Sequence, residues 1–194
     1  MRPSRTISVI AIFTSLIIAS DYALAPALNV KLMDTLVFAS TFVLGFRIGA
    51  SIAVLSELIW SIVTPYGFFL PIVPFLVGGE MLFVFAGYFG AKIWRRDNVS
   101  PIGVENLFFG AILSITAFVW DFETNIATGL LAGARSLYLL LGFEVGGIYF
   151  AIPHELSDFA FGSILAPIII LYFRRYSLKN QNLQTSQLPQ PNQQ

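Results

Sequence analysis

The side chains best suited to chemistry lie inside an unusually apolar part of the chain, in the segment Trp120-Asp121-Phe122-Glu123-Thr124-Asn125. Apolar runs flank it on both sides, at residues 107–119 and 126–132, and together they are long enough to cross a membrane. One Asp at the centre of a spanning helix costs roughly 2.5–3.5 kcal/mol on insertion scales. A cost of that size indicates a cavity lined by protein or water, so the segment predicts one wall of a binding site.

Helical spacing separates these polar residues into two faces. Asp121, Thr124, Asn125 and Thr128 recur at i, i+3, i+4 and i+7, which places them on one side of a helix. Glu123 points about 160° away from Asp121 by helix geometry. We therefore expect Asp121 with Asn125, rather than Glu123, to face the site.

Polar residues of other helices are expected at a similar depth. Glu57 lies in the middle to outer part of a third helix and Glu80 near the middle of a fourth, while His154 and Asp158 are one turn apart in the last helix. The candidate substrate-binding residues are Asp121, Asn125, Trp120, His154, Asp158, Trp60, Glu57 and Tyr66. The alternative is that these groups only hydrogen-bond between helices, and it is strongest for Glu57 and Glu80.

Metal binding and catalysis are not expected. His154, Asp158, Asp121 and Glu155 could offer one nitrogen and several oxygens, but a single histidine among carboxylates is a generic set. No GxSxG, HExxH or glycine-rich phosphate loop is present, so no enzymatic activity and no cofactor are predicted.

The composition is that of an integral membrane protein. Of 194 residues, 56% are hydrophobic and 11% charged, and the mean hydropathy is +0.76; soluble domains carry about 25% charged residues. The absence of cysteine excludes disulfides and thiolate sites. No basic patch lies away from the helix ends, so nucleic acid is not an expected partner. We expect a multi-pass protein of the cell membrane.

The apolar segments predict an all-α bundle of six transmembrane helices, with five as the alternative. Residues 6–24 could be read as a signal peptide, but Pro26 follows the possible cleavage site directly, so a retained first helix is expected. Residues 34–64 are divided at Gly45-Phe46-Arg47-Ile48-Gly49, where glycine permits a turn. The membrane domain covers residues 1–176, and a disordered Gln/Pro-rich cytoplasmic tail covers residues 177–194. The expected helices are 6–25, 34–46, 49–64, 70–92, 105–132 and 148–172.

Basic residues predict that both termini are cytoplasmic. With six helices, nine of the 11 Lys and Arg residues fall on the side of the N-terminus: Arg2, Arg5, Arg47, Lys92, Arg95, Arg96, Arg174, Arg175 and Lys179. Only Lys31 and Arg135 fall on the other side. Cytoplasmic loops of membrane proteins carry this excess, so the count also supports the division between the second and third helices.

The outer connections are apolar and aromatic. Residues 65–71 form a proline-bounded loop that contains Tyr66, and residues 133–147 are expected to form a long glycine-rich loop. Loops of this kind can be lids over a site. The alternative is that they lie at the lipid interface as an aromatic belt.

Small residues form a stripe along the first helix, at Ala11, Ser15, Ala19 and Ala23. Spacing of this type lets a second helix approach closely in lipid. It predicts an interface with a partner, and the alternative is packing within the bundle itself.

These features together resemble a substrate-binding S component of an energy-coupling factor (ECF) type vitamin transporter. The first helix resembles the Ala-x-x-x-Ala helix of that family, with Ser15 in place of one alanine. The run Leu44-Gly-Phe-Arg-Ile-Gly-Ala50 resembles its turn between helices two and three. The segment from His154 to Pro167, followed by Arg174-Arg175, resembles its last helix, and the likeness covers about residues 5–175.

The resemblance implies a vitamin or related micronutrient bound at the outer face under the outer loops. It also implies partners, namely a transmembrane T component that contacts the first helix and two ABC ATPases. Cobalt and nickel members bind metal near a histidine directly after the initiator methionine, where this chain has Arg2, which speaks against a metal substrate. The alternatives are a stand-alone transporter or channel that uses the acids as a proton or cation path, and a membrane scaffold in which they are structural.

Overall fold

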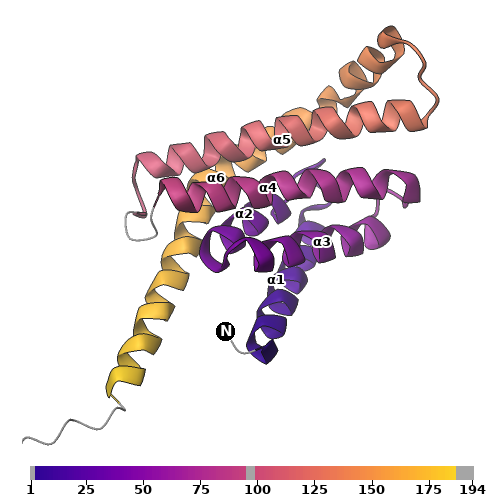
Figure 1. Ribbon diagram of the computed structural model, residues 1–194. Coiled ribbons are helices and arrows are strands. Elements are labelled where there is room, and N and C mark those ends of the chain that lie inside the picture. Colours follow the sequence, from indigo (N-terminus) through magenta and orange to yellow (C-terminus); the bar gives the residue numbers. More distant parts are fainter. Residues whose placement is uncertain (1–2, 95–98, 187–194) are drawn as a thin grey trace, which may run out of the picture.

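The computed structural model describes residues 3–94 and 99–186, with side chains as far as Phe173. These residues form six α-helices and one short 3-10 helix, and no strand occurs among them (Figure 1). The predicted all-helical class is therefore confirmed. The elements are α1 Pro3–Leu24, α2 Met33–Leu44, α3 Phe46–Val63, η1 Leu70–Ile72, α4 Val73–Ile93, α5 Val104–Leu131 and α6 Leu137–Ser186.

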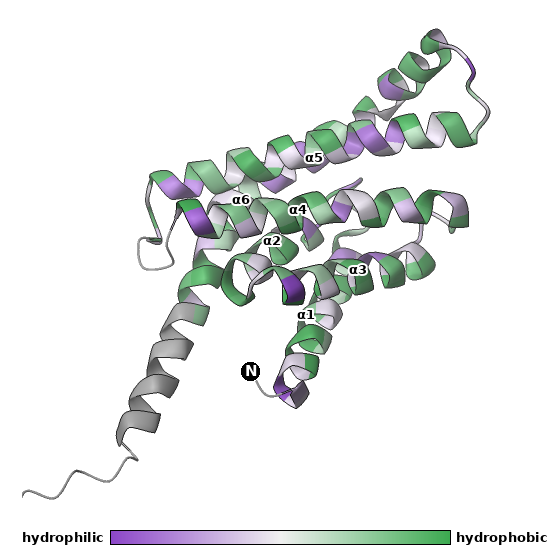
Figure 2. Ribbon diagram, viewed as in Figure 1, coloured by the Kyte–Doolittle hydropathy of each residue, from purple (hydrophilic) through white to green (hydrophobic). Residues whose placement is uncertain are grey.

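Five of the helical segments are long and apolar enough to cross a membrane, which indicates a multi-pass membrane protein. They are Pro3–Leu24, Phe46–Val63, Leu70–Ile93, Val104–Leu131 and Leu137–Phe173. Hydrophobic residues run along the length of each of them (Figure 2). Many large apolar side chains are exposed, such as Ile7, Ile62 and Leu156, as expected where lipid replaces water as the solvent.

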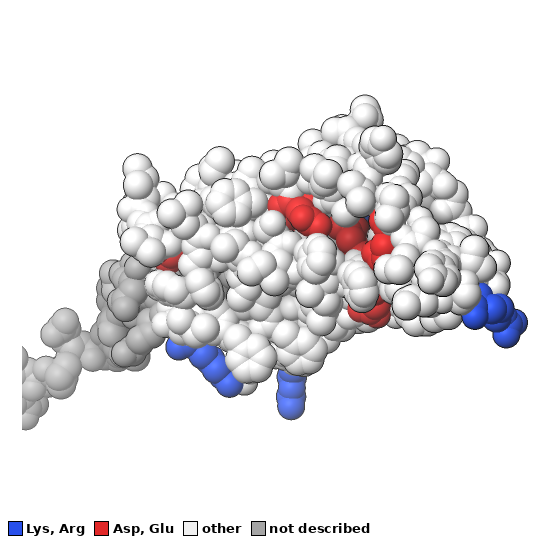
Figure 3. Space-filling model, turned by 90° about the horizontal axis from the view of Figure 1, so that it is seen from above, with Lys and Arg blue, Asp and Glu red and all other residues white. Residues whose placement is uncertain are grey.

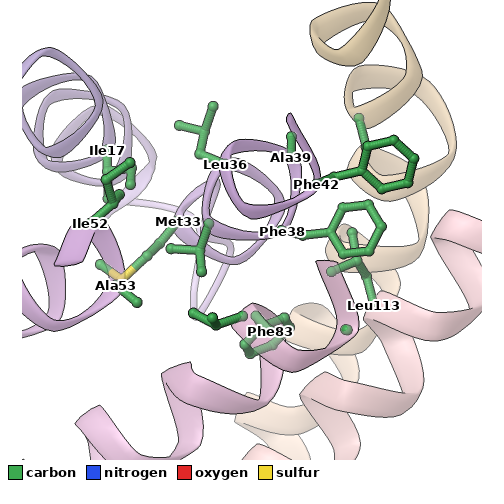
Figure 4. Packing of buried hydrophobic residues seen from close by; sticks show 14 of the residues in the cluster. Ile17, Met33, Leu36, Phe38, Ala39, Phe42, Ile52, Ala53, Phe83 and Leu113 are labelled. Carbon is green, nitrogen blue, oxygen red and sulfur yellow. The ribbon is translucent and has the colours of Figure 1, made fainter. Parts of the chain in front are cut away.

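The second helix is short and enclosed. α2 has 12 residues, a length of about 18 Å, against about 30 Å for a hydrocarbon core. Eleven of its residues are buried, including the polar Asp34, Thr35, Ser40 and Thr41, so other parts of the protein surround α2. Figure 4 shows its side chains reaching neighbours in several directions, with Phe38 and Phe42 on the side of Leu113 from α5. The core of the bundle is thus built around α2.

The division between α2 and α3 was predicted correctly, although the turn is tighter than expected. Gly45 alone separates the helices, and Phe46 already begins α3. Gly45 has a φ of 90° and a ψ of 167°, a backbone conformation that is essentially reserved for glycine. The Gly45 backbone N–H donates to the carbonyl of Thr41 at 2.9 Å and so closes the end of α2.

Glycines allow the helices to approach closely at two places. A Cβ on Gly49 of α3 or on Gly87 of α4 would collide with Thr41, so α2 is held between these two helices. A Cβ on Gly162 of α6 would lie 3.0 Å from the Cα of Gly110 in α5. Close contact of this kind is a main source of helix association in membranes.

The prediction of a long loop at residues 133–147 is wrong. The connection between α5 and α6 covers only residues 132–136, and α6 then runs without a break through Pro153 and Pro167. One of the glycines that suggested a loop, Gly147, is a helix contact site instead, because a Cβ there would collide with Asn125 of α5. The early part of α6 therefore forms a long hairpin with α5, visible in Figure 1.

Hydrogen bonds tie the connections at one end of the bundle together. The Tyr66 hydroxyl, between α3 and η1, donates to the carbonyl of Ala25 in the α1–α2 connection at 2.7 Å. Asn29 of the same connection donates through Nδ2 to the carbonyl of Phe150 in α6 at 3.0 Å. We call this end of the bundle the Tyr66 end.

Some predictions concern residues that the structure does not describe. Arg2, Arg95, Arg96 and residues 187–194 of the predicted tail lie outside the described residues. α6 includes residues 177–186 of that tail. The side chains of Arg174, Arg175 and Lys179 are likewise outside the described part.

Candidate binding site in the bundle

His154 of α6 lies between two buried carboxylates. Its Nδ1 is 3.0 Å from Oδ2 of Asp121 in α5, and its Nε2 is 2.9 Å from Oδ2 of Asp34 in α2. His154 and Asp34 are fully buried, and Asp121 is 6% exposed. With a carboxylate oxygen at each ring nitrogen, the arrangement suits an imidazolium that donates two charge-assisted hydrogen bonds.

Asp158 completes this group, which we call the His154 cluster (Asp34, Asp121, His154 and Asp158). It lies one turn after His154 on α6, and its Oδ2 is 4.0 Å from the His154 Nε2. Asp158 is fully buried, and within the described part of the chain neither of its oxygens has a hydrogen-bond partner. Three helices therefore bring one imidazole and three carboxylates together in the interior.

An aromatic ring and a lysine cover the cluster. The indole of Trp120 meets the His154 ring edge-on, with the centroids 5.4 Å apart. Nζ of Lys31, from the α1–α2 connection, lies 4.4 Å from the centroid of the Trp120 ring, within reach of a cation–π interaction. Burial alone would lower the pKa of Lys31, but the charges of Glu57, Asp34, Glu80 and Asp21 outweigh it and raise that pKa above its usual value.

Asp21 of α1 sets the position at which α2 begins. Its Oδ1 accepts hydrogen bonds from the backbone N–H groups of Leu32, at 2.7 Å, and Met33, at 3.2 Å. A carboxylate at this place satisfies free N–H groups and is favoured by the helix dipole. Because Asp34 lies in the first turn of α2, this contact also helps to position Asp34 beside His154.

A cavity of about 180 Å³ opens beside the cluster, below the connections of the Tyr66 end. We call it the Trp60 cavity. Oε1 of Glu57 accepts a hydrogen bond from Ser61 at 3.1 Å, while its Oε2 has no partner. The cavity is lined by Asn29, Lys31, Glu57, Trp60, Ser61, Thr64, Tyr66, Gly67, Phe69, Ile72, Val73 and Leu76. Three of the predicted binding residues, Glu57, Trp60 and Tyr66, thus share one cavity.

Lys31 and Glu80 link the two parts of the site. Lys31 lines the Trp60 cavity and also lies over Trp120. Glu80 of α4 is fully buried and interacts with both Asp34 and Glu57. No nitrogen or hydroxyl donor reaches either of its oxygens. The cluster and the cavity therefore form one polar region within an apolar bundle.

Asn125 lies apart from this region. Its Nδ2 donates to Oε2 of Glu144 in α6 at 3.4 Å, and it packs against Gly147. With Tyr138 and Phe150 it lines a shallow groove of about 460 Å³ between α5 and α6. Asp121 and Asn125 share a helix face, as predicted from their spacing, but they contact different parts of α6.

Acidic side chains also reach the surface near the polar region that the His154 cluster and the Trp60 cavity form. Figure 3 shows them set in a hollow among uncharged side chains, with basic side chains only at the edges of that face. Glu123, Glu144 and Glu155 are the half-buried acids of α5 and α6. Glu123 faces α4, since its Oε1 lies 3.8 Å from the position of a Cβ on Gly78.

Three residues of the site were missed from the sequence: Asp21, Lys31 and Asp34. A signal was available for the two aspartates, because the cost of a carboxylate in an apolar segment applies to them as it does to Asp121. Lys31 falls in the expected outer connection between the predicted helices 6–25 and 34–46. Nothing in the local sequence indicates that this connection folds back over Trp120.

The small-residue stripe on α1 is uncovered. Ala11, Ser15, Ala19 and Ala23 are all exposed. Shallow apolar grooves of about 420 and 450 Å³ run beside them between α1 and α3, with Leu55 and Ile59 on the far side. Among the described residues, the stripe thus has no covering helix.

No protein-family model, no curated protein and no solved structure matches the chain.

Proposed function

We propose that this chain is the substrate-binding S component of an ECF-type importer, which captures a vitamin or related micronutrient at the outer face of the cell membrane. The observation that carries the proposal is the Trp60 cavity beneath the connections of the Tyr66 end, with a carboxylate, an ammonium group and aromatic rings in its wall. A few convergent polar groups among apolar and aromatic side chains are typical of small-molecule sites. The Trp60 and Tyr66 rings suit stacking on a heterocycle.

In this proposal six helices cross the membrane and both termini are cytoplasmic. The distribution of Lys and Arg supports that orientation, and it places the Tyr66 end outside. The short α2 is accommodated because the surrounding helices, rather than lipid, cover it. The aromatic connections then act as a cover between the cavity and the outer solution.

The first experiment is native mass spectrometry of the protein purified in mild detergent from its own host, with release and identification of any bound molecule. We expect a stoichiometric heterocycle of vitamin size. An empty protein whose melting temperature is unchanged across a panel of vitamins would contradict the proposal, since a ligand at 100 times its Kd stabilises by about 2.7 kcal/mol.

A second support is the exposed stripe of α1, which suits contact with a T component and, through it, two ATPases. We expect Ala19→Leu to reduce copurification of these partners at least about tenfold, because a larger side chain prevents close helix approach. Ligand binding should be unchanged, since none of the stripe residues lines the Trp60 cavity. Ile12→Leu, at an exposed position of the same helix outside the stripe, is the matched control.

The second candidate is a stand-alone transporter driven by protons or cations. It is favoured by the buried carboxylates of Glu80 and Asp158, which have no donor partners, because ionisable residues inside membranes often mark ion paths. Solute uptake into liposomes by the purified chain alone, driven by a proton gradient, would support this candidate over the importer subunit.

A further inference from the structure

We propose that the His154 cluster is a binding site for one divalent first-row transition-metal ion, held by the His154 Nε2 and by carboxylate oxygens of Asp34 and Asp158. The proposal does not depend on the importer function, because it concerns the buried cluster and neither the Trp60 cavity nor a partner. The structure brings in Asp34, which was absent from the set of metal ligands considered from the sequence.

The three ligand groups lie at suitable separations. One ligand atom from each lies within 4.8 Å of the others, and the three residues are buried. The His154 Nε2 is 2.9 Å from Oδ2 of Asp34 and 4.0 Å from Oδ2 of Asp158. Ligand atoms about 2.1 Å from a common ion lie roughly 3.0–3.4 Å apart in octahedral or tetrahedral geometry. Small side-chain rotations would suffice to reach it.

Asp158 gives an independent reason to expect a ligand. It is fully buried, and both of its oxygens lack a hydrogen-bond partner among the described residues. In the same part of the chain, Oδ1 of Asp34 is also buried without a nitrogen or hydroxyl donor, although the Asp34 carboxyl interacts with that of Glu80. A buried carboxylate without a hydrogen-bond partner is costly. The positive charges of His154 and Lys31 act on Asp158, but neither group donates a hydrogen bond to it in the part that the structure describes. An ion between these oxygens would satisfy them directly.

The surroundings of His154 are those of a metal ligand. A histidine that binds a metal through one nitrogen almost always directs the other at a carboxylate or carbonyl group. Here Asp121 accepts from Nδ1 at 3.0 Å and so fixes the ring with Nε2 towards Asp34 and Asp158. On binding, the ion takes the place of the Nε2 proton, which is released to solvent.

The donor set indicates the class of ion. Imidazole suits zinc, nickel, copper and iron, whereas carboxylates alone suit magnesium, calcium and manganese. One imidazole with two carboxylates therefore favours ions such as Co²⁺, Ni²⁺ or Zn²⁺ over Mg²⁺. Glu80, fully buried beside Asp34 and without a donor partner, adds negative charge that favours a cation at this place.

The test uses the full chain in detergent, stripped with EDTA and titrated with Co²⁺ alone. Equilibrium dialysis with elemental analysis gives the stoichiometry, and the visible absorption of Co²⁺ reports nitrogen and oxygen coordination. We expect one Co²⁺ per chain, which Zn²⁺ displaces and Mg²⁺ does not. Asp158→Asn and Asp34→Asn should each weaken binding at least about tenfold, and Asp121→Asn about 10- to 100-fold through the orientation of His154.

Glu155→Gln is the matched control, because Glu155 is an acid on the same helix that is half-exposed and outside the cluster. It should change the affinity less than about twofold. An equal loss in Glu155→Gln and Asp158→Asn, or no stoichiometric Co²⁺ in the unmodified chain, would overturn the proposal. The second outcome needs no variant, so it holds even if a substitution prevents folding. No vitamin or partner takes part, so failure here leaves the importer proposal intact.

Discussion

At the scale of single residues, His154 determines what the buried acids can do. It contacts carboxylates from α2 and α5 through its two ring nitrogens, at 2.9 and 3.0 Å. These contacts favour a single arrangement of α2, α5 and α6, because a shift of one helix along its neighbours would leave a buried charge unpaired. Asp121 is therefore a residue whose charge matters, whereas Glu123 faces α4.

We expect Asp121→Asn to weaken binding of the solute identified by native mass spectrometry at least about tenfold. A hydrogen bond to a charged group contributes about 1.5–3 kcal/mol. The amide removes the charge that orients His154 against Trp120, the ring on which Lys31 of the Trp60 cavity lies. Glu123→Gln should change the affinity less than about threefold. Isothermal titration calorimetry of both variants checks the order, and the reverse order would mean that the solute contacts the α4 side of α5.

At the scale of elements, α4 and α5 approach closely where Trp120 packs. A Cβ on Gly79 would collide with Cδ1 of Trp120, so this glycine makes room for the indole. A Cβ on the neighbouring Gly78 would meet only Oε1 of Glu123, at 3.8 Å. Trp120 in turn contacts His154 and Lys31. The spacing between these two helices therefore controls both parts of the site.

We expect Gly79→Ala to destabilise the protein by about 1–3 kcal/mol, the usual cost of overpacking, and to alter the fluorescence of Trp120. Gly78→Ala is the matched control and should be neutral or stabilising by up to about 1 kcal/mol, because alanine favours a helix over glycine. Thermal unfolding in detergent measures both. Equal midpoints for the two variants would contradict the close packing of Trp120 on Gly79.

At the scale of the whole molecule, the side of the membrane on which the N-terminus lies decides which end of the bundle faces outward, because the Tyr66–Ala25 hydrogen bond holds the α1–α2 and α3–α4 connections at one end. If α2 is a crossing and the N-terminus is cytoplasmic, the α4–α5 and α5–α6 connections lie on opposite sides, with α5–α6 outside. If the N-terminus lies outside, the two sides are exchanged. The proposed function requires the first arrangement, because the Trp60 cavity must open to the outside.

Single cysteines test this arrangement without interference, since the chain contains no cysteine. Ala132→Cys lies in the exposed α5–α6 connection, and Ile102→Cys lies in the α4–α5 connection at a position that is 93% exposed. We expect a membrane-impermeant maleimide to label Ala132→Cys in intact cells, and to label Ile102→Cys only after permeabilisation. The opposite pattern would reverse the orientation and place the Tyr66 end inside.

The sequence by itself determined the class of protein and most of the helices. Apolar segments and charge counting predict an all-helical membrane bundle, and Gly45 marks the division between α2 and α3, because these signals are local. The cost of burying Asp121 and the one-turn spacing of His154 and Asp158 are also local signals. They indicated candidate residues of the site before any contact between them was known.

Only the tertiary structure decided which of these residues meet. Asp34 and His154 are 120 positions apart in the chain, and a helix period carries no information on contacts between helices. Lys31 reaches Trp120 because its connection folds back into the bundle. The glycines at the start of α6 suggested a loop, yet the segment is helical there because packing against α5 outweighs local propensity.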